Sequence, residues 1–572
     1  MKKWVDMFTH FWKKKIYVIA LALTAACSYG FMITNYAISI DDTPYAYYFE
    51  EGLAAIVGRW VLYLLNKVIN IGEFAPYLTD LAGVLIFMVA VTVWSTLLYH
   101  ILKDRVPWYG YLFFACIFIS CPLISEVYPY YLHNGIAMGY FFSSVSLCLF
   151  MEGMENWLVP RKQSEKGEAA SIGRRVFLLV GSAICLWLAL GCYESFMMVW
   201  LMGVCLLLAL KRICGEKPAV IFTILMAGVV AIGSMVLRSI TISLITAVFD
   251  LGYLKDAAVQ RSITELIGWI LEPDAFSNFA MALKRIYLMY GVFGCAYYPI
   301  FVFVLATIVI MLTALWMSIR RRDLWIFLLT VAGYVAAFSL IVIEGKATYY
   351  RAAQFLPVLC GLGALLFVYA VESLISKMPG QKESPQGSGA KPAMAVRGIA
   401  VLLLSSILWN QCADMNKWFY VDYLKYEAAK ETMNQVVYEL EKGFDTSKPI
   451  VFTGIYEIPP GIIAPAYVGY DTKEYTFMVN ATDWLDGHLL EKFYRDQGVI
   501  VAQMPTLSVI EWGRTAFGTD GELVKFFEMH GYKLYPLVDR DYSEAEELSA
   551  SWPSFPMEGS IGDAGEYLIV HF

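Results

Sequence analysis

The chain has 572 residues, of which 59% are hydrophobic and only 16% are charged. Soluble domains carry about 25% charged residues, so this composition excludes an ordinary soluble globular protein. The excess apolar residues gather in runs close to the roughly 20 residues that cross a bilayer, which predicts a polytopic α-helical membrane protein. The formal net charge of −7 decides little, because the distribution of charge matters more. The eleven cysteines lie almost wholly in or beside apolar runs and show no disulfide framework or CxxC metal site.

The first apolar run, residues 16–36, follows Lys2, Lys3 and residues 13–15, which are all lysine. Basic flanks stay in the cytoplasm, so we expect the N-terminus inside and the run to be a retained anchor. Residues 50–72 are apolar but interrupted by charges, which indicates an interfacial helix. The sequence predicts about eleven spans: 16–36, 77–100, 107–123, 135–158, two within 176–210, one from about 220, 298–319, 324–343, 353–371 and 398–412.

The apolar stretch 176–210 is interrupted only at residues 191–195. A single span here would place Lys211 and Arg212 outside, together with the later basic cluster 320–322. Two short spans with an outer turn at Glu194 keep both clusters inside, as the bias of Lys and Arg toward the cytoplasm requires. We therefore predict a hairpin.

From residue 413 the composition becomes that of a soluble domain. Strand-like runs alternate with helical patterns, which is typical of a small α/β domain, and by parity this domain is extracytoplasmic. The predicted strands are 449–454, 499–503, 533–538 and 567–572, and the predicted helices are 423–442, 484–496 and 521–530. The predicted organisation is a membrane domain, 1–412, and an extracytoplasmic domain, 413–572.

Two adjacent carboxylates, Asp41 and Asp42, follow the first span directly. Acids beside lipid are costly to place and often mark chemistry, although Asp and Pro also simply end helices. The other unusual ionisable groups near the membrane also fall toward the outer face: Glu194, Arg238, Lys346 and Arg351. Transporters usually keep such groups near the bilayer midplane, so this placement favours chemistry at the outer surface over passage through the membrane.

Each of these groups also has a purely structural interpretation. Glu194 could cap a tight turn, Arg238 could reach toward lipid headgroups, and Lys346 and Arg351 could be ordinary loop charges. His133 could be an ordinary loop histidine, and the outer tyrosines could form an aromatic belt.

Three short elements carry a family resemblance: Ser39-Ile40-Asp41-Asp42, Gly58-Arg59-Trp60 and Tyr193-Glu194-Ser195. Their order and topology resemble the bacterial O-antigen glucosyltransferase II family (the phage-type glucosyltransferases), which has the GT-C membrane glycosyltransferase architecture. The resemblance covers roughly residues 16–412 and leaves the C-terminal domain uncovered. Glu194 stands where the resemblance leads us to expect glutamine.

The resemblance implies transfer of a sugar, expected to be glucose, from a polyprenyl-phosphate carrier to a cell-surface glycan at the outer leaflet of the bacterial cell membrane. Asp42, or else Asp41, would be the general base. Arg59, Arg238 and Arg351, with Lys346, would bind the donor phosphate. The candidates for binding sugar or acceptor are Glu194, Tyr45, Trp60, Tyr128, His133 and Tyr349. The second aspartate could hold the acceptor or join a divalent metal, but we predict no metal or other cofactor. Membrane lipid is an expected partner, and nucleic acid is not.

Two other classes of function remain open. One is a glycan or lipid exporter whose outer acids bind cargo, and the other is a sensor or assembly protein of the cell envelope. Replacement of the aspartates separates them from the transferase, because only the transferase needs a base.

Overall fold

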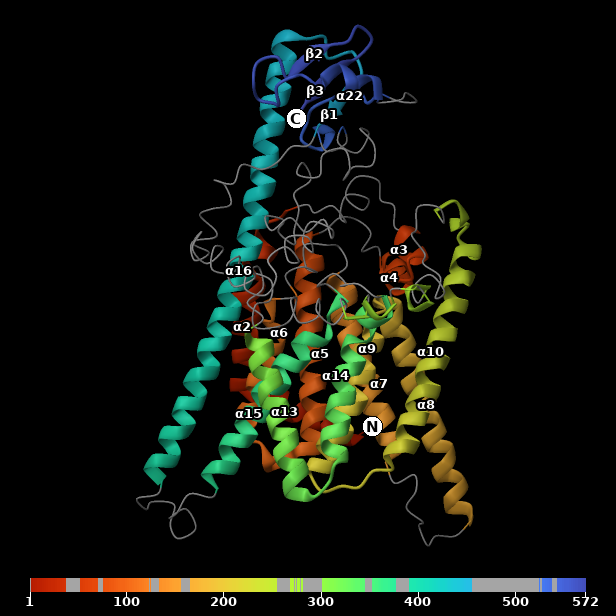
Figure 1. Ribbon diagram of the computed structural model, residues 1–572, viewed down its shortest axis with the longest axis vertical. Coiled ribbons are helices and arrows are strands. Elements are labelled where there is room, and N and C mark those ends of the chain that lie inside the picture. Colours follow the sequence, from red (N-terminus) through yellow and green to blue (C-terminus); the bar gives the residue numbers. More distant parts are fainter. Residues whose placement is uncertain are drawn as a thin grey trace.

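The computed structural model describes residues 2–37, 52–69, 76–122, 124, 133–155, 165–254, 268–271, 273, 275–277, 279–280, 301–344, 352–376, 390–454, 524, 527–537 and 543–572. Most of these residues form a bundle of long helices, with a small sheet domain beyond one end of the bundle (Figure 1). The long helices are α2 (Lys15–Thr34), α5 (Pro76–Leu102), α7 (His133–Met154), α8 (Glu165–Cys192), α9 (Phe196–Ile213), α10 (Val220–Val248), α13 (Phe301–Arg321), α14 (Trp325–Glu344), α15 (Phe355–Ile375) and α16 (Ala390–Gly443).

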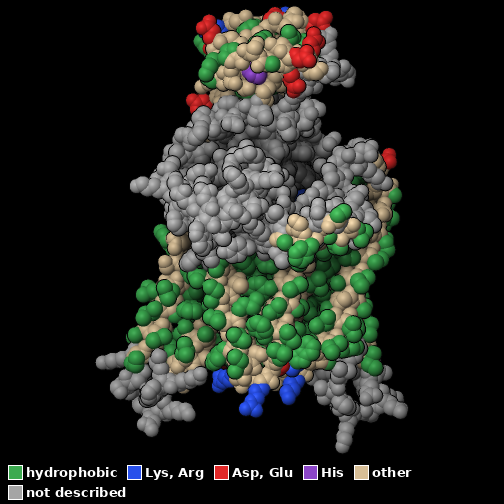
Figure 2. Space-filling view, viewed as in Figure 1, with side chains coloured by type: hydrophobic (Ala, Val, Ile, Leu, Met, Phe, Trp, Pro, Cys, Tyr) green, Lys and Arg blue, Asp and Glu red, His purple; other side chains and the backbone are tan. Residues whose placement is uncertain are grey.

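Nine helices in the described part of the chain are long and apolar enough to cross a membrane. Two shorter apolar helical segments, α6 (Trp108–Ile119) and Trp325–Leu340 of α14, coincide with the third and ninth predicted spans. Hydrophobic side chains form a broad band across the bundle on the face shown in Figure 2, as a lipid-facing surface requires. The protein is therefore a multi-pass membrane protein, and the total of eleven spans stays a prediction.

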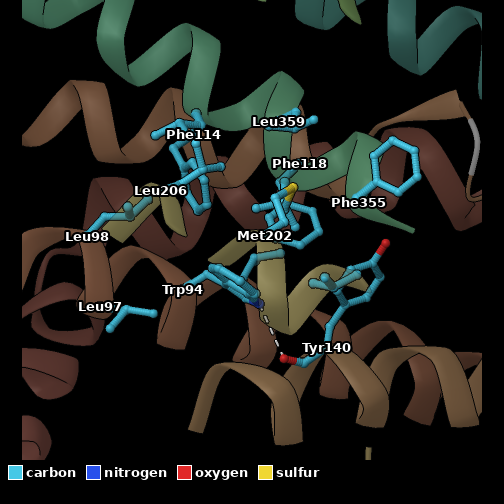
Figure 3. Close-up of a cluster of buried hydrophobic side chains, with 14 of the residues drawn as sticks. Trp94, Leu97, Leu98, Phe114, Phe118, Tyr140, Met202, Leu206, Phe355 and Leu359 are labelled. Atoms are coloured by element: carbon cyan, nitrogen blue, oxygen red, sulfur yellow. Dashed lines mark hydrogen bonds between the residues drawn. The ribbon is translucent and has the colours of Figure 1, made fainter. Parts of the chain in front are cut away.

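Large aromatic side chains fill the centre of the bundle. Trp94 of α5, Phe118 of α6, Tyr140 of α7 and Phe355 of α15 belong to one buried cluster (Figure 3). The Trp94 Nε1–H donates to the backbone oxygen of Tyr140 (3.3 Å), and the Tyr140 hydroxyl donates to the backbone oxygen of Gln354 (2.7 Å). Buried Trp and Tyr usually place their polar atoms in this way, so these contacts fix how α5, α7 and α15 face one another.

The predicted hairpin within 176–210 is confirmed. Helix α8 ends at Cys192 and α9 begins at Phe196, so a short turn joins the two helices. As a result, Arg212 at the far end of α9 reaches Asp323 before α14, with Nε 2.7 Å from Oδ2. At the same end of the bundle, Arg397 of α16 pairs with Glu372 of α15 (Nε–Oε1 2.8 Å). Two ion pairs between segments far apart in the sequence thus join parts of the chain at this end of the bundle.

The N-terminal helix α1 (Lys2–Lys13) was not predicted. It lies before α2 and packs against α5 through buried Phe11. The Trp4 indole N–H donates to Glu152 of α7, and the Trp4 ring lies 4.6 Å from the His100 ring. Lysines that the sequence marks only as a topological signal therefore also belong to an amphipathic helix that packs on the bundle.

Two predicted helical boundaries were wrong. The described part of the interfacial segment 50–72 forms two helices, α3 (Gly52–Ile56) and α4 (Trp60–Ile69), because the backbone turns at Gly58 with φ +94°. The eleventh span and the helix predicted at 423–442 are one continuous helix, α16, of 54 residues. No residue between 412 and 423 is proline or glycine, so nothing in the sequence interrupts the helix where the composition changes. The predicted domain boundary at residue 413 consequently falls inside α16.

The C-terminal region has a three-stranded sheet in the order β1-β3-β2, built from β1 (Ile450–Thr453), β2 (Ile561–Asp563) and β3 (Leu568–His571). Strand β3 runs parallel to β1 and antiparallel to β2, with Val451 opposite Ile569 and Gly562 opposite the same residue. One face of the sheet packs on α16, and the other packs on α22 (Ser543–Ser549).

The predicted strands 449–454 and 567–572 are confirmed as β1 and β3. The described part of the segment 533–538, residues 533–537, forms only an isolated bridge, Pro536 to Ile450, because proline cannot donate to a ladder. Residues 527–529 are helical, as predicted for 521–530. The predicted strand 499–503 and helix 484–496 lie outside the described residues, and β2 and α22 were not predicted.

Candidate active site at the Gly58–Trp60 elbow

The turn between α3 and α4 places Arg59 at one end of the bundle. The Arg59 backbone N–H donates to the oxygen of Ala54 (2.7 Å), which closes α3, and the Arg59 oxygen accepts from Leu62 (3.2 Å), which opens α4. Gly58 makes the turn possible, because its positive φ strains any residue with a Cβ. A Cβ at Gly58 would also lie 1.9 Å from Nη2 of Arg238. The elbow therefore brings Arg59 close to a second cation on α10.

The α8–α9 turn supplies the partners of both arginines. The Arg59 guanidinium carbon lies 4.6 Å from the centre of the Tyr193 ring, a cation–π contact. Arg238 donates from Nη2 to Oε2 of Glu194 (2.9 Å) and from Nε to the backbone oxygen of Leu190 (3.2 Å). The turn predicted from charge distribution thus joins the Gly-Arg-Trp element and Arg238 in one cluster.

The two ion-pair partners differ in exposure. The Arg238 side chain is 14% exposed, whereas the Glu194 side chain is 57% exposed. Arg59 is half-buried and has no carboxylate partner among the described residues, and its charge also acts on Arg238. The described cluster contains two cations, Arg59 and Arg238, and one carboxylate, Glu194, so one positive charge is uncompensated. This charge is on the partly exposed guanidinium of Arg59, which is planar and can bind an oxyanion through two hydrogen bonds.

The depth of Arg238 follows from helix geometry. Arg238 is 18 residues beyond Val220, the first residue of α10, which is about 27 Å along the helix axis. The hydrocarbon core of a bilayer is about 30 Å thick. If α10 begins at one membrane surface, Arg238 lies near the opposite surface, where lipid headgroups are.

Trp60 packs inside the cluster. It is 3% exposed, its ring centre lies 4.6 Å from that of Trp187, and a Cβ on Gly191 would meet its ring at 2.4 Å. Trp187 is held in turn by its indole N–H, which donates to Oγ1 of Thr241 (3.1 Å). These contacts show that Trp60 packs α4 against α8, which is a structural role. They leave little ring face for a sugar, and its predicted sugar contact stays untested.

Sequence reasoning missed Trp187, Gly191 and Thr241 as parts of this cluster. A signal existed, since Trp187 precedes Gly191 by four residues and Thr241 follows Arg238 by three. Such spacings place residues on one helix face. The sequence could not tell which faces meet.

Of the remaining predicted site residues, the structure describes only His133. His133 is the first residue of α7, and this end of α7 lies beside α4, where a Cβ on Gly135 would touch Leu62. The other predicted site residues lie outside the described part of the chain: Asp41, Asp42, Tyr45, Tyr128, Lys346, Tyr349 and Arg351. The structure therefore brings together Arg59, Trp60, Glu194 and Arg238. Among the described residues there is no group of three His, Cys, Asp or Glu side chains that could hold a metal ion.

Comparisons with known proteins bear on the same region. Among solved structures the chain is similar to ArnT from Cupriavidus metallidurans bound to undecaprenyl phosphate, with 11% sequence identity, a TM-score of 0.31, and coverage of 81% of this chain and 87% of that chain. A search of curated proteins finds no match. The sequence model of the glucosyl transferase GtrII family matches residues 30–368, which is 339 of 572 residues and includes all three short elements that carried the resemblance. The predicted family is thereby confirmed: the chain belongs to the glucosyl transferase GtrII family and is a membrane glycosyltransferase.

Proposed function

We propose that the protein transfers glucose from a polyprenyl-phosphate carrier to a cell-surface glycan at the outer face of the bacterial cell membrane. The observation that carries the proposal is the Arg59 guanidinium, half-buried beside Arg238 and without a carboxylate partner in the described part of the chain. Family membership supports glucosyl transfer, and a lipid phosphate is an anion that resides at headgroup depth. The described cluster offers a positive charge at that depth.

In the proposed reaction an acceptor hydroxyl oxygen attacks the anomeric carbon of the donor sugar. The bond between that carbon and the phosphate oxygen breaks, and the phosphate leaves with the bonding electrons. Negative charge grows on the phosphate in the transition state, where fixed positive charge stabilises it. Arg59 would contact the phosphate directly, and Arg238 would add a second guanidinium once it exchanges Glu194 for phosphate.

The proton of the acceptor hydroxyl needs a base. Asp42 is our first candidate and Asp41 the second, because a carboxylate pair directly follows the first span in the sequence. Lys346 and Arg351 would add to the phosphate site, while Tyr45, Tyr128, His133 and Tyr349 would line the sugar or acceptor path. The proposal includes no metal ion, because arginines supply the positive charge that the leaving phosphate requires.

The proposed orientation puts the N-terminus in the cytoplasm and the C-terminal domain outside. The basic residues before α2 and after α13 support this arrangement, since Lys and Arg concentrate on the cytoplasmic side. The acceptor glycan and the lipid-linked donor then meet at the end of the bundle that carries Arg59.

The test is a transfer assay with purified protein, radiolabelled polyprenyl-phosphoglucose and surface polysaccharide. Replacement of Arg59 by alanine is expected to reduce kcat/KM for the donor roughly tenfold to a hundredfold, the range for a lost charge-assisted hydrogen bond. Lys67→Ala is the matched control, because it removes an exposed cation from the neighbouring helix α4.

Asp42→Asn and Asp41→Asn, measured separately, should reveal which replacement abolishes turnover without weakening donor binding. Normal transfer by Arg59→Ala, or by a variant that combines Asp41→Asn with Asp42→Asn, would refute the assignment.

A further inference from the structure

The part of α16 beyond the membrane carries a cleft of about 340 Å³. The span in α16 ends at Asn416, and the cleft begins at Glu427 and extends to Asn434. At about 1.5 Å per residue this is roughly 16 to 27 Å further along the helix. Figure 1 shows α16 running unbroken from the bundle to the sheet domain, so the cleft is carried on a rigid support above the end where Arg59 lies.

The floor of the cleft is a polar stripe on one face of α16. Lys430 and Glu431 lie three and four residues after Glu427 and four and three residues before Asn434, so each of them neighbours both of these residues on the helix surface. The neighbouring face of the helix, with Met433 and Val437, is buried against the sheet domain. His530 forms the opposite wall, and Met433 completes the lining.

Contacts within the cleft fix several of its polar groups. Lys430 Nζ lies 2.6 Å from Oε1 of Glu427 and 4.9 Å from the centre of the Tyr426 ring. The Tyr532 hydroxyl donates to Oδ1 of Asn434 (2.8 Å), which leaves the Asn434 amide N–H groups as donors to a ligand. Glu431 is exposed, and no interaction of its carboxylate with another described residue is observed. The cleft thus presents the amide N–H groups of Asn434 as donors and the carboxylate of Glu431 as an acceptor, three residues apart on the helix.

The chemistry of the lining selects the kind of ligand. Among the described residues no three ligating side chains come together for a metal ion. The two carboxylates and one lysine disfavour an anion, and a single apolar side chain, Met433, disfavours a lipid chain. A saccharide fits, because its vicinal hydroxyls both donate to carboxylates and accept from amide and ammonium groups. The cleft volume is also within the range of small-molecule sites, about 300–1,000 Å³.

The cleft lies near the end of the chain segment that precedes the predicted base, Asp42 or Asp41. The Tyr36 ring packs edge-on against the Tyr426 ring, with centres 5.8 Å apart, so the end of α2 touches the part of α16 that bears the cleft. Tyr36 lies five residues before Asp41 in the sequence, a length of chain that reaches at most about 18 Å. This short connection limits how far the acidic pair can lie from the part of α16 that bears the cleft.

We propose that this cleft binds a saccharide segment of the acceptor glycan and presents the chain to the transfer site. The proposal rests on the proposed function for its biological role, but saccharide binding can be measured without turnover. Glu431 and Asn434 are the residues that contact the sugar hydroxyls, and Lys430 with Glu427 completes the polar floor.

The experiment measures two affinities of the full-length protein in nanodiscs. One ligand is an oligosaccharide fraction cut from the surface polysaccharide of the cells that express the protein, and the other is polyprenyl monophosphate. The double variant Glu431→Gln/Asn434→Ala is compared with Glu439→Gln, which alters an exposed carboxylate on the same helix. Thermal unfolding of each variant checks that folding is retained.

We expect the double variant to bind the oligosaccharide about tenfold more weakly, as loss of two hydrogen bonds predicts, with polyprenyl monophosphate binding and the control unchanged. Equal oligosaccharide affinity for the wild type and the double variant would overturn the cleft proposal. Absence of polyprenyl monophosphate binding by the wild type would instead overturn the donor assignment, so the two failures are distinguishable.

Discussion

Gly58 is the residue on which the geometry of the cluster depends most closely. Its φ of +94° is costly for any other residue, and a Cβ there would displace the Arg238 guanidinium. Because that guanidinium is the end of a long side chain, it can move aside. The main consequence of a substitution is therefore loss of the Arg238–Glu194 contact and of the position of Arg59, rather than unfolding.

We expect Gly58→Ala to lower the free energy of unfolding by about 1–3 kcal/mol, the cost of a left-handed non-glycine residue, and to reduce transfer activity more than tenfold. Gly252→Ala is the control, since a Cβ there meets no atom within 4 Å and its φ is not positive. Thermal unfolding and initial rates of the purified variants provide the measurements. Full activity of Gly58→Ala would show that the elbow does not need its observed backbone.

Glu194 acts in the present structure as the counter-ion of Arg238. A lipid phosphate that approaches both arginines must compete with this carboxylate and is repelled by its charge. Because the Glu194 side chain is 57% exposed, water screens its charge, and two unit charges about 4 Å apart in water repel by about 1 kcal/mol.

Replacement of Glu194 by glutamine removes the charge and keeps the shape of the side chain. The expected result is about fivefold tighter binding of polyprenyl monophosphate, measured by titration in detergent. Glu194→Asp keeps the charge and should show no gain in affinity. If Glu194→Gln instead weakens phosphate binding, Glu194 holds Arg238 in its binding position and is not a competitor.

At the scale of elements, α16 joins the membrane bundle to the sheet domain without a break. Its inner part is anchored by the Arg397–Glu372 pair, and its middle is anchored by Asn416, which donates to the backbone oxygen of Cys27 on α2. Its outer part forms the core of the C-terminal domain through Val436 and Leu440. Continuity of this helix fixes the height of the domain above the membrane.

Spin labels at Met394 and Tyr438 test this continuity, because both side chains are well exposed on α16. Forty-four residues of straight helix predict a narrow distance distribution near roughly 66 Å. Pulsed electron–electron double resonance on protein in nanodiscs measures the distribution. A broad distribution centred at a markedly shorter distance would mean that the helix breaks between the membrane and the domain.

Some elements could be read from sequence and others could not, and the difference has a physical reason. The α8–α9 hairpin was predictable because charge bias chooses between two topologies. Strands β1 and β3 were predictable because they are short apolar runs. The kink at Gly58 and the unbroken course of α16 depend on tertiary contacts, since glycine is tolerated in helices and a change of composition does not end one.

The same limit applies to the site. Arg238 and Glu194 were singled out as unusual charges near a membrane surface, Arg59 was singled out through the Gly-Arg-Trp resemblance, and the structure brings the three together. The roles of Trp187, Gly191 and Thr241 emerge only when α4, α8 and α10 are seen to pack. Hydrophobic periodicity shows that a helix has a buried face, but not which neighbour covers it.

At the scale of the whole molecule, charge is distributed unevenly between the two ends. On the face shown in Figure 2, the described Lys and Arg side chains gather at one end of the bundle and the Asp and Glu side chains gather on the sheet domain at the other. Under the positive-inside bias, this distribution supports the proposed orientation, in which Arg59 and the sheet domain lie outside.

Cysteine accessibility tests this orientation in a background in which the eleven native cysteines are replaced. Tyr438→Cys is expected to react with an impermeant thiol reagent in intact cells stripped of their outer layers. Arg322→Cys, at the opposite end of the bundle, should react only after the membrane is permeabilised. Both side chains are exposed, so labelling in the reverse pattern would invert the topology.

The most direct measurement is a cryo-electron microscopy structure of the protein with bound polyprenyl monophosphate. Our account predicts that the phosphate lies within hydrogen-bonding distance of Arg59, about 3 Å, with Arg238 turned toward it and away from Glu194. A phosphate bound at the other end of the bundle, beside the Arg212–Asp323 pair, or far from both Arg59 and Arg238, would contradict it.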